Sequence, residues 1–179
     1  MKQNKTLLSD QDIRRIITRI AYEIVEIHKG TTNLALVGIQ TRGDFLAKRL
    51  ADEIKAIEGP QLPVGSMDIN MYRDDWTQIS HQPIVRPSKI DFSVDEMTII
   101  LVDDVLYTGR TIRAAMEALM DFGRPARIEL AVLVDRGGRE LPIQADYKGR
   151  FCDTAPEETI QVHVKEHDGQ DLVFKEIQS

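Results

Sequence analysis

Two adjacent aspartates, Asp103 and Asp104, directly follow the apolar run 97–102 (MTIILV), and a Tyr-Thr-Gly-Arg-Thr loop comes soon after them. The backbone N–H groups and hydroxyls of such a loop can bind a phosphate, and its glycine lets the backbone approach closely. The aspartates would repel this phosphate, so they must face a part of the ligand that offers hydrogen-bond donors or develops positive charge. A ribose 5-phosphate meets both demands, with its free hydroxyls on the carboxylates. The residues predicted to bind the 5-phosphate are Tyr107, Thr108, Gly109, Arg110 and Thr111.

Two simpler interpretations compete with a sugar-phosphate site. A solvated, aspartate-rich turn with a threonine helix cap would explain the acid pair alone, but not the whole string after a buried strand. A receiver-type phosphoaspartate domain also carries paired acids, but it gives the Thr-Gly loop no role. The chain contains neither GxxxxGK[ST] nor GxGxxG, so the patterns of nucleoside triphosphatases and dinucleotide-binding domains are absent.

Strand and helix patterns alternate around this motif. From Asp12 to Ile27 isoleucines recur at the spacing of an amphipathic helix, with Ser9 as the expected N-cap and Gly30 as the terminator. Such alternation predicts a parallel α/β sheet, in which ligands bind beyond the carboxyl ends of the strands. The two aspartates are therefore expected at that edge, after their strand. Strands are predicted at 34–39, 64–72, 97–102 and 127–134, and further helices up to about residue 57 and over about 110–122.

Two other segments have their own character. Residues 73–96 show neither period, and a polar loop this long inside a compact domain is usually a lid or a binding loop. The C-terminal stretches IQVHVKE and DLVFKEI predict a β-hairpin about residues 167–170.

The bulk composition predicts a single globular domain over residues 1–179, since 42% of the residues are hydrophobic and 29% charged. The lone cysteine, Cys152, cannot form an intrachain disulfide, and no signal peptide or membrane-length apolar run is recognisable, so a cytoplasmic protein is expected. The formal charge of −6 argues against a generic nucleic-acid binder. The first 50 residues nevertheless carry nine Lys/Arg against five Asp/Glu, so a local basic face is possible.

The string ILVDDVLYTGRT resembles the phosphoribosyl pyrophosphate (PRPP) motif of the type I phosphoribosyltransferases. The stretches VGIQTRGDFLAKRLA, YRDD, GRPARIELAVLVDRGGRELPIQADY and IRRIITRIA are similar to the bacterial PyrR family. This resemblance implies an α/β type I phosphoribosyltransferase fold: a central, mainly parallel sheet flanked by helices, with a small hood and a C-terminal β-hairpin. It also implies two activities. The first is the Mg²⁺-dependent conversion of uracil and PRPP to UMP and pyrophosphate. The second is regulation of pyrimidine operons by UMP-dependent binding to leader mRNA (transcription attenuation).

The resemblance assigns roles within the site. Asp103 and Asp104 would hold the ribose hydroxyls and act in catalysis with Arg42. Any metal would be bound mostly by PRPP and water, with these two aspartates as candidate ligands. A turn with a helix cap is the alternative reading of Thr41-Arg42-Gly43, which in related enzymes binds pyrophosphate, often through a non-proline cis peptide. The assigned residues are Thr41, Arg42 and Gly43 for pyrophosphate, Tyr72, Arg73, Asp74 and Asp75 for the lid, and Val134, Asp135 and Arg136 for uracil.

RNA regulation would need a basic surface away from the pocket. Arg15, Thr18, Arg19 and Tyr22 form one stripe of the first helix, opposite its isoleucines, and suit phosphate contact and base stacking. A plain solvated face is the alternative, but the resemblance favours RNA and adds Arg139 and Arg150. UMP, leader mRNA and further copies of the chain, as a homodimer or larger homo-oligomer, are the implied partners.

Two departures bear on this surface. The family stretch RGHRELPIRAD is RGGRELPIQAD here, so Gly138 and Gln144 stand where the family has a histidine and an arginine. Each lost cation weakens phosphate binding. A salvage phosphoribosyltransferase with RNA binding weakened or lost is therefore the alternative function, and a non-enzymatic sensor of PRPP or UMP is a third.

Overall fold

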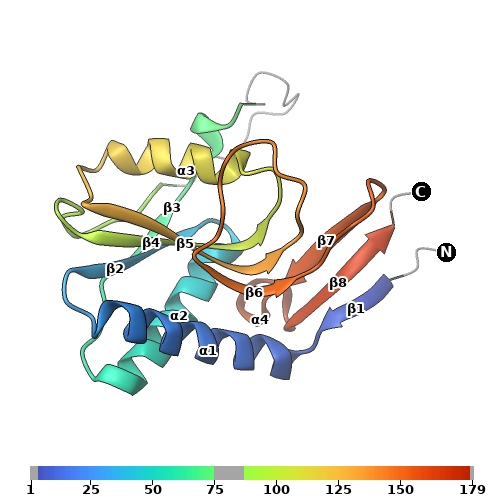
Figure 1. Cartoon of the computed structure of the whole chain (residues 1–179), viewed down its shortest axis with the longest axis horizontal. Helices are drawn as coiled ribbons and strands as arrows, with labels where there is room; N and C mark the ends of the chain where they lie inside the picture. The colour runs from blue at the N-terminus through green and yellow to red at the C-terminus, as the bar shows by residue number, and fades with distance from the viewer. Residues whose placement is uncertain (1–3, 75–86, 178–179) are drawn as a thin grey trace.

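The computed structural model describes residues 4–74 and 87–177, and its centre is a five-stranded sheet in which every pairing is parallel (Figure 1). The predicted α/β class is confirmed. The strands lie in the order β3 (Val64–Met67), β2 (Leu34–Ile39), β4 (Thr98–Leu106), β5 (Arg127–Asp135) and β6 (Tyr147–Phe151).

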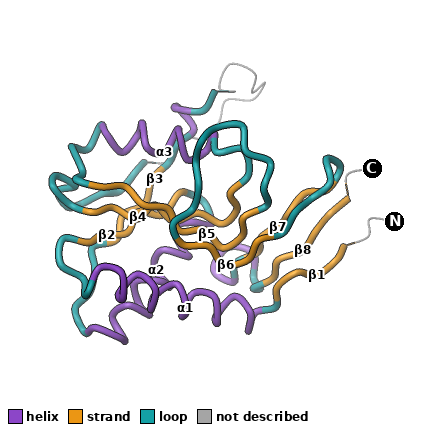
Figure 2. The backbone as a smooth tube through the Cα atoms, viewed as in Figure 1, coloured by secondary structure: helices purple, strands orange, loops and turns teal. Residues whose placement is uncertain are grey.

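Helices cover both faces of this sheet. Helices α1 (Asp10–His28) and α2 (Arg42–Glu58) lie on one face, and α3 (Arg110–Met120) lies on the other (Figures 1 and 2). Two apolar core layers result, because alternate residues of the buried strands point to opposite faces. Their burial on both sides explains the nearly continuous apolar runs in β2, β4 and β5.

A second, antiparallel sheet lies beside the first and is called the hood below. It consists of β1 (Asn4–Leu8), β8 (Leu172–Ile177) and β7 (Glu158–His163), with the short helix α4 (Lys165–Asp168) between β7 and β8. The predicted C-terminal hairpin is thus confirmed, and its turn contains α4. The pairing of β1 with β8 joins the two ends of the chain in one sheet, which no local pattern in the sequence indicated.

Helix α1 follows its sequence signals closely. Ser9 is the N-cap: its hydroxyl accepts a hydrogen bond from the backbone of Asp12, whose carboxylate accepts one in return from the Ser9 backbone. The helix ends at Lys29 in the left-handed conformation, directly before Gly30.

Within residues 4–74 and 87–177, none of the helices combines the length and the apolar character that a membrane span requires.

Besides β1, which was not predicted, two strands differ from the sequence-based prediction. The strand predicted over 64–72 ends at Met67, and a short 3-10 helix, η1 (Asn70–Tyr72), follows; the Asp68 carboxylate accepts the Asn70 N–H and turns the chain there. Strand β6 was not predicted because YKGRF is mostly polar and exposed, as suits a strand at the edge of a sheet.

Candidate functional site

The acid pair lies at the carboxyl edge of the parallel sheet. Strand β4 pairs with β2 only as far as Val102, but it pairs with β5 as far as Leu106. Asp103 and Asp104 therefore belong to β4 itself, whereas the sequence had predicted them to follow the strand. Among the described residues the pairing with β2 stops at Val102, and Gly43 in the first turn of α2 packs against β4 at this point.

The electrostatics of the acid pair are unfavourable without a ligand. Asp103 is buried, at 7% exposure, and burial raises its pKa well above the ordinary value; the charge of Asp104 raises it further. Burial also raises the pKa of the less buried Asp104, opposed by hydrogen bonds and by the charge of Arg42. The backbone N–H of Asp104 donates to the Asp103 carboxylate at 2.9 Å. A ligand that donates hydrogen bonds or carries positive charge would relieve this cost.

The predicted phosphate loop joins β4 to α3 and borders a cavity. Gly109 has φ +93° and immediately precedes α3, while the Thr108 hydroxyl accepts a hydrogen bond from the Arg110 backbone N–H at 3.3 Å. A cavity of about 240 Å³ opens beside the loop. It is lined by Arg73, Asp74, Thr108, Arg110 and Thr111. A helix N-terminus with two hydroxyls beside a cavity of this size suits a phosphate group.

The described part of the predicted lid is fastened to α3. Asp74 bridges two arginines of that helix, at 2.9 Å to Arg110 and 2.8 Å to Arg113. Arg113 also donates to the Tyr72 carbonyl at 2.8 Å. Arg113 was not predicted, because its role depends on a partner 39 residues away. Asp75, the fourth predicted lid residue, lies outside the described residues.

The Thr41-Arg42-Gly43 segment links β2 to α2 and carries the cis peptide implied by the family resemblance, between Gln40 and Thr41. Gly43 packs so closely on β4 that a Cβ atom built on it would lie 2.4 Å from the Val102 carbonyl oxygen. The pyrophosphate-loop candidate and the acid pair are thus in direct contact. Arg42 forms a two-point ion pair with Asp168 of the hood, which the sequence did not reveal.

The predicted uracil segment turns its side chains inward. Val134, Asp135 and Arg136 are all buried. The Arg136 guanidinium lies 3.7 Å from the centre of the Tyr107 ring, and Asp135 pairs with Arg139 at 2.7 Å. The Tyr107 ring therefore packs against Arg136, while 44% of the residue stays exposed. A base at this position would therefore be recognised partly by backbone groups.

The predicted RNA stripe lies on α1, but acidic residues interrupt it. Arg15 and Tyr22 are exposed, whereas the Thr18 hydroxyl donates to Glu53 at 2.9 Å. Arg19 pairs with a neighbouring glutamate, and it also donates to two backbone carbonyls of β6. These contacts bring β6, with the exposed Arg150, against the stripe.

The RNA-binding role that the resemblance assigns to Arg139 stays a prediction, and in the structure the Arg139 side chain is 22% exposed. Its guanidinium donates to the carbonyls of Tyr107, Gly137 and Ile143 and pairs with Asp135. Ile143 packs in the core layer on the α3 side of the sheet, opposite α1. Arg139 therefore links the loop that follows β4 to the loop that follows β5.

Comparison with known proteins gives a consistent result. Residues 3–167 match the model of the phosphoribosyl transferase domain family. "Bifunctional protein PyrR" of Pelotomaculum thermopropionicum is 55% identical over 174 residues, covering 97% of this chain and 96% of the relative. The proteins of the same name from Deinococcus radiodurans and Bacillus mycoides are 54% and 57% identical, covering 94% and 97% of this chain and 92% and 97% of theirs.

Solved structures share the architecture at lower identity. The hypoxanthine phosphoribosyltransferase of Trypanosoma cruzi matches with a TM-score of 0.73 at 18% identity, covering 97% of this chain and 96% of that chain. The corresponding enzyme of Staphylococcus aureus matches with a TM-score of 0.69 at 20% identity, covering 97% and 92%. These likenesses show a common fold.

Proposed function

The chain belongs to the phosphoribosyltransferases and, within them, to the bifunctional PyrR family, and on that basis we propose that it converts uracil and PRPP to UMP and pyrophosphate and regulates pyrimidine operons through leader mRNA. One observation carries the enzymatic half: the acid pair, the phosphate loop and Arg42 converge at the carboxyl edge of one sheet.

Each part of this edge has a task in the proposed reaction. The phosphate loop holds the 5-phosphate, and Asp103 and Asp104 hold the ribose hydroxyls and stabilise positive charge that grows on the ribose ring. Arg42 neutralises the departing pyrophosphate. The backbone at Val134–Arg136 orients uracil, so that catalysis is chiefly placement and electrostatics. Tyr72, Arg73 and Asp74 form the stem of the proposed lid, which would keep water from PRPP.

Mg²⁺ suits this site as a partner of PRPP. Across residues 4–74 and 87–177, no group of three or more histidine, cysteine or acidic side chains could hold a metal by itself. Mg²⁺ usually keeps several waters and takes substrate phosphate oxygens with one or two carboxylates. Asp104, the more exposed of the pair, could supply one carboxylate. The ion would neutralise charge on the pyrophosphate.

A base-specificity assay tests the enzymatic proposal. With PRPP and Mg²⁺ we expect turnover of uracil, and little or none of orotate, hypoxanthine or adenine. The reaction is followed by release of pyrophosphate and by chromatography of the nucleotide product. If another base is turned over and uracil is not, that base is the substrate and the uracil proposal is wrong. PRPP binding without any product would favour a non-enzymatic sensor.

The RNA-binding half rests on the α1 stripe and on the family. Arg15 is its most available cation, since its side chain is 77% exposed and its nearest acidic partner lies 3.9 Å away. Arg150 adds a second exposed arginine from β6. A homodimer, which the family resemblance implies, would present two such faces to one RNA.

A filter-binding titration against the leader RNA of its own pyrimidine genes tests this half. We expect UMP to tighten binding. Arg15→Ala should weaken binding several-fold and reduce the slope of log K against log salt concentration by about one, because one phosphate contact is lost. Lys55→Ala, an exposed cation on α2, serves as control and should leave both quantities unchanged.

Weak RNA binding whose affinity UMP does not change would instead indicate a salvage enzyme that has lost its RNA-binding surface. In that case Gln144→Arg, which restores the family's cation at an exposed position, shows whether the departure is responsible. Recovery of binding in this variant would assign the loss to that position.

A further inference from the structure

We infer that Asp168 of the hood is a positioning residue: its carboxylate orients Arg42 toward the pyrophosphate group of PRPP and keeps Arg42 away from Asp104. This inference rests on the proposed phosphoribosyl transfer. It assigns the hood a part in the reaction through a side chain 126 residues distant from Arg42 in sequence.

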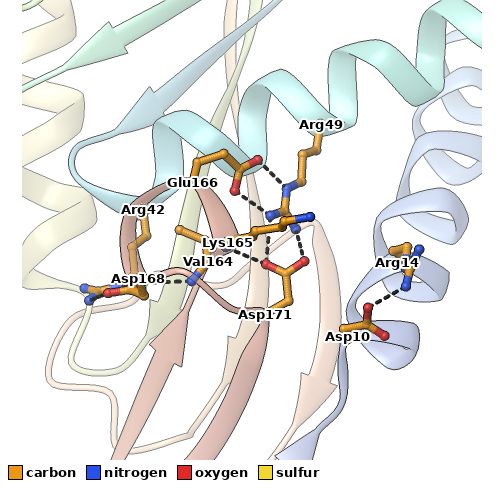
Figure 3. Close-up of polar contacts among 9 residues, drawn as sticks. All are labelled: Asp10, Arg14, Arg42, Arg49, Val164, Lys165, Glu166, Asp168 and Asp171. Atoms are coloured by element: carbon orange, nitrogen blue, oxygen red, sulfur yellow. Dashed lines mark hydrogen bonds and ion pairs between the residues drawn. The ribbon is translucent and has the colours of Figure 1, made fainter.

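The contact itself has the geometry of a specific ion pair. Nε of Arg42 donates to one Asp168 carboxylate oxygen at 3.0 Å, and Nη2 donates to the other at 2.9 Å (Figure 3). Such a two-point pair fixes the plane of the guanidinium as well as its position. The Asp168 side chain is only 13% exposed, so solvent competes weakly for it.

The hood holds Asp168 firmly in place. Its carboxylate also accepts the Val164 backbone N–H at 2.8 Å, at the start of α4. Two turns further along α2, Arg49 pairs with Glu166 and Asp171 on either side of Asp168 (Figure 3). The segment that carries Asp168 is therefore docked on the same helix whose first residue is Arg42.

Asp168 also remains charged in the working pH range. Hydrogen bonding to Arg42 is the largest effect on this carboxyl and lowers the pKa of Asp168 from 3.8 to about 2. The same contact raises the pKa of Arg42, and the charge of Asp104 acts in the same direction. Arg42 thus lies between two carboxylates, of which one binds it directly and the other attracts it.

This arrangement keeps the positive charge of Arg42 apart from the negative charge of Asp104, and the proposed reaction needs both groups free to contact PRPP. If Arg42 closed on Asp104, the pair would block the ribose hydroxyls and remove the cation from the leaving group. The two-point pair with Asp168 occupies Nε and Nη2 of Arg42 and leaves its Nη1 without a hydrogen bond among the described residues. That edge is the one available for pyrophosphate oxygens.

The test compares two aspartates of the hood. Asp168→Asn should lower kcat for UMP formation about tenfold with little change in the KM for uracil, because it disturbs the leaving-group cation rather than the base. Asp171→Asn removes one of the two acidic partners of Arg49, but Glu166 still pairs with Arg49 and the Val164 N–H still holds Asp168, so kcat should stay within about twofold of the wild type. An equal loss in both variants would reduce Asp168 to a structural role and overturn the inference.

A second comparison asks whether Asp168 acts through Arg42. In an Arg42→Ala background, Asp168→Asn should change kcat less than about twofold, since the group to be positioned is gone. The same tenfold loss in both backgrounds would contradict the inference. Calorimetric titration with magnesium pyrophosphate should show weaker binding to Asp168→Asn than to the wild type, and unchanged or tighter binding would also overturn it. Because this titration needs no turnover, a wild type inactive on uracil would count against the proposed function alone.

Discussion

Asp104→Asn should lower kcat/KM for PRPP about 100-fold or more while the protein stays folded. The carboxylate is expected to contact the ribose hydroxyls and to stabilise positive charge that exists only in the transition state, and removing one such preorganised group typically costs two to three orders of magnitude. The neutral amide keeps the shape of the side chain and its acceptor oxygen, which takes the Val105 N–H at 2.8 Å. Steady-state kinetics with PRPP as the varied substrate provide the measurement.

The same variant should be at least as stable as the wild type at neutral pH. Burial raises the pKa of Asp103 and Asp104 above the ordinary 3.8, so the folded protein binds more protons than the unfolded chain between 3.8 and the raised values. Stability therefore falls as the pH rises through that window. Replacing one acid with a neutral amide removes part of this cost, and the advantage of the variant over the wild type should shrink toward pH 4. Thermal unfolding of both proteins across this range measures it.

Asp91→Asn provides the matched control, because Asp91 is exposed and belongs to none of the segments assigned to the site. It should change neither kcat/KM nor the midpoint of unfolding. Unfolding of Asp104→Asn would mean that the acids serve the fold. Full activity in the folded variant would remove Asp104 from the ribose contact.

Features encoded by neighbouring residues were predictable from the sequence. Ser9 and Asp12 lie three residues apart and cap α1 as such a pair should, and the order of apolar runs gave the parallel sheet. The juxtaposition of an acid pair and a Thr-Gly loop was equally local, so the sequence alone was enough to propose a sugar-phosphate site.

Contacts between distant segments were not predictable. The helical spacing placed Arg19 on a surface stripe, but it could not show that two carbonyls of β6, about 130 residues away, would accept hydrogen bonds from its guanidinium. The resemblance likewise placed Arg139 on the RNA surface without showing that three carbonyls would accept hydrogen bonds from it and that Asp135 would pair with it. In both cases the missing information is the identity of a partner that only tertiary folding supplies.

Gly43→Ala should damage both the fold and the reaction. A Cβ atom at this position would lie 2.4 Å from the Val102 carbonyl oxygen and 3.3 Å from the Asp103 Cα, both backbone atoms that cannot swing away. Overpacking of this kind costs about 1–3 kcal/mol, and a chain of this length loses about 2–4 °C in Tm per kcal/mol. Alanine's better helix propensity returns less than about 1 kcal/mol, so the net change remains destabilising.

The loss of activity should exceed what the loss of stability explains. Relief of the clash moves the first turn of α2 away from β4, and Arg42 moves with it relative to Asp103 and Asp104; a displacement of about 1 Å at such a site can cost about 100-fold in rate. Gly65→Ala is the matched control, since its Cβ would lie 3.0 Å from the Ile90 side chain and no closer than 3.3 Å to any backbone atom, against 2.4 Å at Gly43. Kinetics well below the Tm of both variants should show a large loss only for Gly43→Ala. Near-normal kcat and Tm there would mean that the pyrophosphate loop does not depend on its contact with the acid-bearing strand.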